Sequence, residues 1–248
     1  MRFFINFSYK GTNYHGWQEQ PNANSIQAEI NIALQTILNA DIQVVGAGRT
    51  DAGVHAKQMF GHFDYDYDND MDIQNIIFKL NGFLPLDICI HNIFKVKKDS
   101  HCRFDALSRS YQYHIIYKKD PFNKTAYLLQ QKLDVDAMNI ASQYLIGKQD
   151  FSSFSKAKTQ TFTNNCDVML AKWEEEHNEL IFTIKADRFL RNMVRAIVGT
   201  LLDVGAGKIA AQDIVDIISA RDRSYAGVSV PAHALFLVDI KYPDGIKL

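Results

Sequence analysis

Residues 2–10 read Arg-Phe-Phe-Ile-Asn-Phe-Ser-Tyr-Lys, and this stretch sets the first element of the fold. Apolar and polar residues alternate along most of it, although Phe4 breaks the polar set. A period of two places one set of side chains on each face of a β-strand. The stretch therefore predicts a strand with one face in the core.

Helical spacing follows from Ser25, a residue type that caps helices. Apolar side chains then recur every three or four residues and form one helix face: Ile26, Ile30, Ala33, Leu34, Ile37 and Leu38. The same reasoning predicts strands over 42–45, 59–64 and 88–96, and a helix after Asp72. The first part of the chain thus has the order β-α-β-β-α-β.

The second part repeats this order approximately. The patterns predict a strand over 111–117, a helix after Asp134, a hairpin turning at His177-Asn178, helices over 188–204 and 213–219, and a strand over 235–242. We therefore predict an α+β protein with two ferredoxin-like (β-α-β-β-α-β) halves, residues 1–100 and 101–248. Their antiparallel sheets are expected to join into one extended sheet, with helices packed on one face and an active-site cleft between the halves.

Composition places the chain among ordinary globular proteins, because 47% of its 248 residues are hydrophobic and 22% are charged. Its apolar runs are shorter than the roughly 18 residues of a membrane helix, and its first residues do not resemble a signal peptide. We expect a cytoplasmic protein without membrane contact. The formal charge of −1, from 27 basic and 28 acidic residues, does not by itself indicate nucleic-acid binding.

The three cysteines are odd in number and form no CxxC pair, which argues against a disulfide framework or a zinc ribbon. The nearest group of metal-ligand residues is split across a predicted strand and its exit: Cys89, His91, His101 and Cys102. We therefore expect no metal site.

The densest chemical signal is residues 46–56, Gly-Ala-Gly-Arg-Thr-Asp-Ala-Gly-Val-His-Ala, between two predicted strands. Loops held by rigid strands commonly carry function. Its glycines match neither a phosphate-binding P-loop nor the dinucleotide fingerprint, and His55 has no metal-ligand spacing. Arg49 and Asp51 either pair or point separately into a cleft. Asp51 is also typical of a turn aspartate before a glycine.

The segment from Gly48 to Ala56 is identical to GRTDAGVHA, and the chain resembles the tRNA pseudouridine synthase A family that carries this active-site motif. Further similar segments span both halves: 9–11, 14–18, 25–27, 84–88, 103–106, 109–113, 189–195 and 231–238. The chain departs from the family pattern at Gln149, where histidine is common, and at His233-Ala234, where an acidic residue and glycine are common. These departures concern fine substrate contacts.

The resemblance implies a role for each of five residues. Asp51 is the catalytic carboxylate, Arg49 its loop partner, Tyr111 the aromatic residue against the target base, Arg195 the active-site arginine and Leu235 an apolar pocket wall. It also implies a homodimer that isomerises uridines on the 3′ side of the anticodon arm of tRNA, at positions 38 to 40. No cofactor and no metal are expected.

The reaction itself agrees with this residue set. Pseudouridine formation breaks the bond from ribose to N1 of uracil and joins the sugar to C5, so nothing is oxidised or added. Asp51 either attacks the ribose or removes a ribose proton, and the sequence leaves both routes open. Glycosidases that release the base generally need two carboxylates, whereas this loop supplies one.

Basic residues are expected to bind the RNA backbone. Arg188, Arg191 and Arg195 have the spacing of one face of the helix predicted over 188–204, which would present a basic stripe. Other candidates for phosphate contacts are Lys118, Lys119, Lys156, Lys158, Arg221 and Arg223.

Two other functions fit part of the pattern. Tandem β-α-β-β-α-β units also describe paired RNA-recognition modules, but the chain has no RNP1 segment. A small-molecule enzyme that binds phosphate with the glycine loop is disfavoured by the glycine spacing.

Overall fold

The computed structural model describes residues 1–66, 72–156 and 162–248 of a mixed α+β protein. The chain divides into two compact units, residues 1–107 with 237–248 and residues 108–236. The predicted halves placed all of 101–248 together, whereas the residues from 237 onward belong to the first unit. Among the described residues, no helix has both the length and the apolar character needed to cross a membrane.

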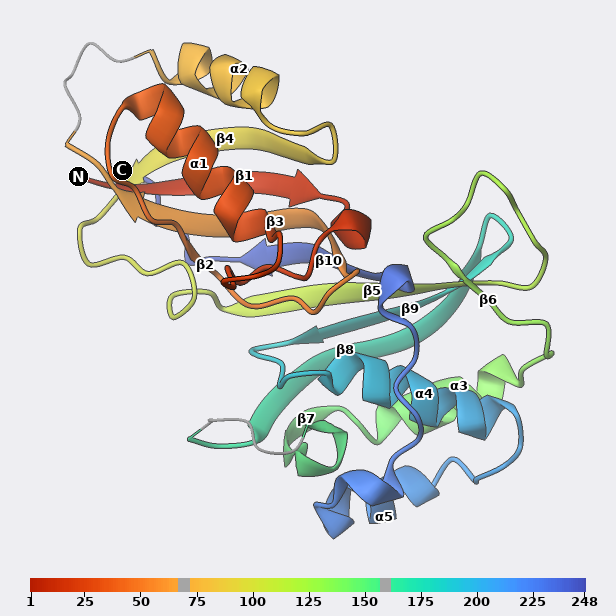
Figure 1. Ribbon diagram of the computed structural model, residues 1–248. Coiled ribbons are helices and arrows are strands. Elements are labelled where there is room, and N and C mark those ends of the chain that lie inside the picture. Colours follow the sequence, from red (N-terminus) through yellow and green to blue (C-terminus); the bar gives the residue numbers. More distant parts are fainter. Residues whose placement is uncertain (67–71, 157–161) are drawn as a thin grey trace. The chain divides into compact units, whose positions relative to one another are not determined.

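The first unit contains a sheet in the order β4-β1-β3-β10, with β2 beside β3. Its elements are β1 (Arg2–Tyr9), α1 (Ile26–Leu38), β2 (Val45–Gly46), β3 (His55–Asp64), α2 (Ile73–Phe83), β4 (Ile88–Val96) and β10 (Leu235–Lys241). β1 runs antiparallel to both β3 and β4. Figure 1 shows α1 and α2 over one face of this sheet.

The predicted strand over 2–10 and the helix starts at 25 and 72 are confirmed. The burial pattern of β1 keeps Phe3, Phe4 and Ile5 all in the core, so both strand faces are covered there. Ser25 caps α1 by accepting the Ala28 N–H at 3.3 Å. This cap satisfies an amide group that the start of a helix leaves without a backbone partner.

The strand predicted over 42–45 is wrong for residues 42–44, because side chains of α1 bind the backbone there. Gln35 Nε2 donates to the Ile42 carbonyl at 2.9 Å, and Gln27 Nε2 donates to the Val44 carbonyl at 2.8 Å. Asn31 Oδ1 accepts the Val44 N–H at 2.9 Å. The alternating burial of Ile42 and Val44 imitates a strand, but helix amides replace the sheet partner.

The second unit contains a sheet in the order β5-β9-β8-β7, with β6 beside β5. Its elements are β5 (Ser108–Ile116), β6 (Tyr127–Leu128), α3 (Val135–Gln143), β7 (Gly147–Asp150), β8 (Asn165–Glu176), β9 (Glu179–Ala186), α4 (Met193–Gly205) and α5 (Asp213–Ala220). The predicted hairpin at His177-Asn178 is confirmed, with positive φ at both residues. In Figure 1, α3 and α4 lie beside this sheet. The ferredoxin-like description and the joining of the two sheets stay predictions.

The helix predicted over 188–204 begins five residues later, and the basic stripe predicted on it is wrong. Asn192 stands immediately before α4 with φ of +67°, a left-handed conformation that interrupts a helix. Arg188 and Arg191 therefore lie in the connection from β9, and only Arg195 is on α4. The helix is buried on nearly all sides, so it has no exposed stripe to present.

Candidate active site

The Asp51 turn lies between β2 and β3. The Asp51 carbonyl accepts the Val54 N–H at 3.1 Å, and Gly53 at the third turn position has φ of +82°. Glycine adopts that conformation without strain, as this turn requires. Because the backbone closes the turn, closure does not require the Asp51 carboxylate. The Asp51 side chain is half-buried and Arg49, in the same loop, is exposed.

Residues 9–17 hold the turn through Thr50. The Trp17 N–H donates to the Thr50 carbonyl at 3.2 Å, and the hydroxyls of Tyr9 and Thr50 lie 2.8 Å apart. Gly16 has φ of +96°, and a Cβ there would lie 2.5 Å from the Thr50 carbonyl oxygen. The backbone of residue 16 thus passes so close to the turn that only glycine fits.

Gly11 makes a second close approach, to Val54, which follows Asp51 in the sequence. A Cβ on Gly11 would lie 2.0 Å from the carbonyl oxygen of Val54. The Gly11 N–H donates to Nδ1 of His55 at 2.9 Å, and His55 is 1% exposed. His55 therefore has a structural partner that fixes the start of β3 against residue 11.

Asp87 binds the same segment through Lys10 and Tyr14. Its backbone carbonyl accepts the Lys10 N–H at 2.8 Å, and its carboxylate accepts the Tyr14 hydroxyl at 2.5 Å. Burial and this carboxylate raise the pKa of Tyr14, so the hydroxyl stays a donor. Segments 9–11, 14–18 and 84–88 thus form the frame of the Asp51 turn, a role that sequence reasoning did not assign.

Tyr111, the predicted base-stacking residue, lies on β5 opposite Ile184 of β9. Its half-buried ring meets the Phe189 ring edge-on, with centroids 5.1 Å apart and an interplanar angle of 88°. Such an aromatic contact fixes the orientation of a ring. Phe189 was not predicted as a site residue, although the similar segment 189–195 begins with it.

Arg195, in the first turn of α4, holds the segment that leads to Leu235. Its Nε donates to the Val230 carbonyl at 2.8 Å, and its own carbonyl accepts the Val230 N–H at 3.2 Å. The buried Tyr113 hydroxyl donates to the Pro231 carbonyl at 3.0 Å. Burial raises the pKa of Tyr113, and the charge of Arg195 partly opposes this. Leu235 is buried, with 5% of its surface exposed, and its role as an apolar wall stays a prediction.

Further cations surround the connection between β9 and α4. Arg109 Nη1 donates to the Asp187 carbonyl at 2.8 Å, and the Asp187 carboxylate accepts the Arg188 N–H at 2.7 Å. Arg191 is exposed and its carbonyl accepts the Lys156 N–H at 3.1 Å. Lys158, another predicted candidate for phosphate contact, lies outside the described residues.

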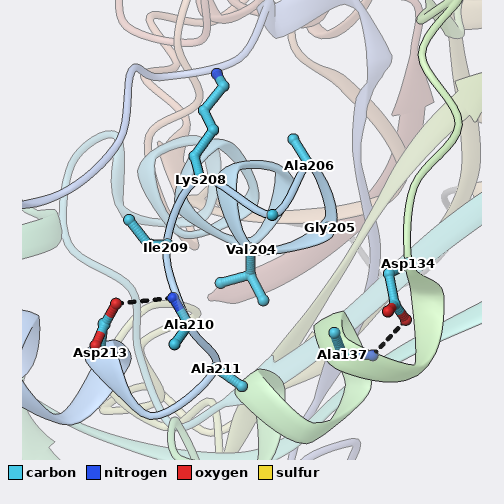
Figure 2. Close-up of a pocket in the computed structure, with 11 residues that line it drawn as sticks. Asp134, Ala137, Val204, Gly205, Ala206, Lys208, Ile209, Ala210, Ala211 and Asp213 are labelled. Carbon is cyan, nitrogen blue, oxygen red and sulfur yellow. Dashed lines mark hydrogen bonds between the residues drawn. The ribbon is translucent and has the colours of Figure 1, made fainter.

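A hollow between the end of α4 and the start of α3 contains none of the predicted site residues (Figure 2). Its two carboxylates serve as local caps. Asp213 accepts the Ala210 N–H at 2.8 Å, and Asp134 accepts the Ala137 N–H at 2.9 Å. These contacts account for its polar lining, and we assign it no function.

Comparison with known proteins relates the whole chain to one family. The family model described as tRNA pseudouridine synthase matches residues 5–105 and 141–243. These stretches include Asp51, Arg195 and Leu235, while Tyr111 lies between them. Proteins named tRNA pseudouridine synthase A are similar over nearly their full length.

Three relatives illustrate the range. The protein from Parabacteroides distasonis is 50% identical over 247 residues, which cover 98% of this chain and 96% of the relative. That from Bacteroides fragilis is also 50% identical over 247 residues, with 99% and 98% covered. That from Exiguobacterium sibiricum is 36% identical over 247 residues, with the same coverage of 99% and 98%.

Proposed function

The chain belongs to the tRNA pseudouridine synthase family, and from this premise we propose that Asp51 is its catalytic carboxylate and the anticodon arm of tRNA its target. As a family member, the protein is an isomerase that converts uridine to pseudouridine in tRNA. The choice of uridines on the 3′ side of the anticodon arm belongs to the proposal.

The isomerisation is balanced within the nucleotide. The bond between ribose C1′ and uracil N1 breaks, the base turns while it stays bound, and a bond forms between C1′ and C5. The proton on C5 then leaves to solvent and N1 takes up a proton from solvent, so the product is an isomer of the substrate. Asp51 acts either by attacking the ribose or by removing a ribose proton, and both routes need an ionised carboxylate within bonding reach.

The observation that carries this assignment is the construction of the Asp51 turn. Its main chain closes the turn without the carboxylate, and close contacts from Gly11 and Gly16 fix its position. A catalytic group works best when the surrounding structure holds it in place before substrate binds. A simple structural turn has no need for such a frame.

We propose that Tyr111, Arg195 and Arg49 act on the same nucleotide. A uridine within a stem must leave its stack, at a cost of a few kcal/mol. Stacking on the Tyr111 ring returns about 1–3 kcal/mol, and Phe189 supports that ring from its edge. Exposed Arg49 is suited to a phosphate contact beside the turn. Leu235 supplies apolar surface to the base.

The proposal includes a homodimer that works in the cytoplasm. Its support is the resemblance of the sequence to the family, in which one tRNA contacts both subunits. Sedimentation of the purified chain with and without tRNA would test the dimer: a two-chain complex supports it, and a single chain on one tRNA contradicts it.

The direct test compares the wild type with Asp51→Ala on unmodified tRNA. Pseudouridine is located by chemical mapping, and binding is followed by gel shift. We expect modification in the anticodon arm by the wild type only, with binding by both. Modification by Asp51→Ala would refute the role of Asp51. Wild-type modification confined to another arm would refute the target alone, and binding without modification by either protein would favour an RNA-binding module.

A further inference from the structure

Two histidines and a cysteine meet in the first unit, away from the Asp51 turn in sequence. They are His62, on β3, and His101 and Cys102, in the loop after β4. Their ligand atoms all lie within 4.8 Å of one another, and His62 Nδ1 is 3.1 Å from Cys102 Sγ. From this geometry we propose that His62, His101 and Cys102 bind a zinc ion that joins the loop to the sheet.

The donor set suits this metal. Zinc prefers imidazole nitrogen and thiolate sulfur, in tetrahedral sites with three or four protein ligands. Ideal Zn–N and Zn–S bonds place neighbouring ligand atoms about 3.3–3.6 Å apart. The His62–Cys102 separation of 3.1 Å is slightly shorter than that spacing, and all three ligand atoms lie within 4.8 Å of one another. A small rotation of the half-buried His101 ring would complete the set, and water would fill the fourth position.

The backbone around the cluster is already held in place. Arg2 Nη1 donates to the Ser100 carbonyl at 3.0 Å, and the Tyr242 hydroxyl donates to the Cys102 carbonyl at 2.5 Å. The His101 N–H donates to the Asp105 carboxylate at 2.8 Å. A site held in this way loses little conformational entropy when the metal binds.

The charged side chains around the cluster balance one another. Asp64 and Asp105 on the negative side and Arg2 on the positive side act on His62, and Arg103 adds a positive charge beside His101. A zinc ion with one thiolate therefore meets little net charge from these groups.

Binding changes one covalent bond in the protein. In the metal-free protein the Cys102 Sγ donates to the Val45 carbonyl at 3.0 Å, so it carries a proton. Zinc replaces that proton: the S–H bond breaks, the S–Zn bond forms, and the proton passes to the buffer. No electron transfer is involved.

Sequence spacing hid this site because His62 comes from a distant strand. In the sequence, His101 and Cys102 stand closest to Cys89 and His91, a grouping from which no metal site was expected. In the structure, Cys89 and His91 lie on the exposed side of β4, and His91 Nε2 is 2.8 Å from the hydroxyl of Ser8. Cys89 and His91 still lie near each other, with Sγ and Nδ1 3.9 Å apart, and so they provide a matched control.

The test adds Co²⁺, as a spectroscopic substitute, and then Zn²⁺ to the full chain after treatment with a chelator. The wild type and Cys89→Ser should bind one ion per chain, with a thiolate-to-cobalt charge-transfer band and the visible bands of tetrahedral cobalt. Zinc should displace the cobalt and raise the melting temperature of both proteins. Cys102→Ala should lose the band and the thermal shift.

Three results would overturn the proposal. They are no band in Cys89→Ser, an unchanged band in Cys102→Ala, or octahedral cobalt without thiolate in the wild type. Circular dichroism checks that Cys102→Ala is folded, and His101→Ala, which alters a half-buried residue, provides a second variant that must also lose the ion. The measurements use no tRNA, so their outcome is independent of the proposed function.

Discussion

Gly11→Ala should slow pseudouridine formation without touching any reacting group. The added Cβ would lie 2.0 Å from the Val54 carbonyl oxygen, and such contacts are essentially never shorter than 3.0 Å. The backbone must therefore move by about 1 Å, and Val54 is the residue whose N–H closes the Asp51 turn. A misplacement of about 1 Å costs about 100-fold in rate, or about 2.7 kcal/mol in activation free energy.

The assay is single-turnover pseudouridine formation on one tRNA transcript, with tRNA affinity measured separately. We expect the rate constant to fall about 100-fold while the dissociation constant changes little. Gly82→Ala is the matched control, since a Cβ at Gly82 on α2 meets nothing within 4 Å. It should leave the rate unchanged and stabilise the helix by about 0.5–1 kcal/mol.

A second variant tests the same frame in case Gly11→Ala unfolds the protein. Gly16→Ala places its Cβ 2.5 Å from the Thr50 carbonyl oxygen and also opposes a positive φ, so it should slow the reaction as well. If Gly11→Ala melts like the wild type and reacts at the wild-type rate, the turn does not depend on this frame and the reasoning is wrong.

Three more predictions follow from other contacts. Tyr111→Ala should lower kcat/KM by the value of a lost stack, about 1–3 kcal/mol, and Tyr111→Phe should recover most of it; equal losses would exclude stacking. Arg195→Lys should lower the free energy of unfolding in urea by about 1.5–3 kcal/mol, because lysine cannot reproduce the Nε bond to Val230. Burial raises the pKa of Cys166 to about 12, so iodoacetamide at pH 8.5 should label exposed Cys89 and leave Cys166 unmodified. Rapid labelling of Cys166 at pH 8.5 would contradict its burial. Because the folded pKa of Cys166 lies above its unfolded value, this thiol contributes stability below about pH 9, and that stability is lost as pH rises toward 12.

Local patterns predicted the elements whose conformation is marked by the period of their own sequence. The alternation in β1 and the capped apolar face of α1 are period signals, and both elements stand where they were expected. Two errors share one cause, which is that a partner outside the segment decides its conformation. Residues 42–44 bind side chains of α1 instead of a strand. Asn192, whose left-handed backbone delays the start of α4, donates its side-chain amide to the Ser229 hydroxyl at 2.6 Å.

The candidate site likewise has features that the local sequence indicates and features that only the fold brings together. Physical reasoning from the sequence found the loop of Asp51 but left its role open between turn and catalyst, and only the resemblance favoured catalysis. The need for glycine at positions 11 and 16 arises from close tertiary approach, which no local pattern records. Likewise, His62 is 40 residues from Cys102 in sequence, so their meeting required the fold.

The most direct measurement of the central claim uses Asp51→Asn and tRNA with tritium at C5 of uridine. Asparagine keeps the size of the side chain and the main chain keeps the turn, while the change removes the negative charge of the carboxylate. Formation of the C1′–C5 bond must release the label into water. We predict that Asp51→Asn binds tRNA as the wild type does but releases tritium about 10²- to 10⁴-fold more slowly. Release within about tenfold of the wild-type rate, a difference of about 1.4 kcal/mol, would contradict the role of Asp51.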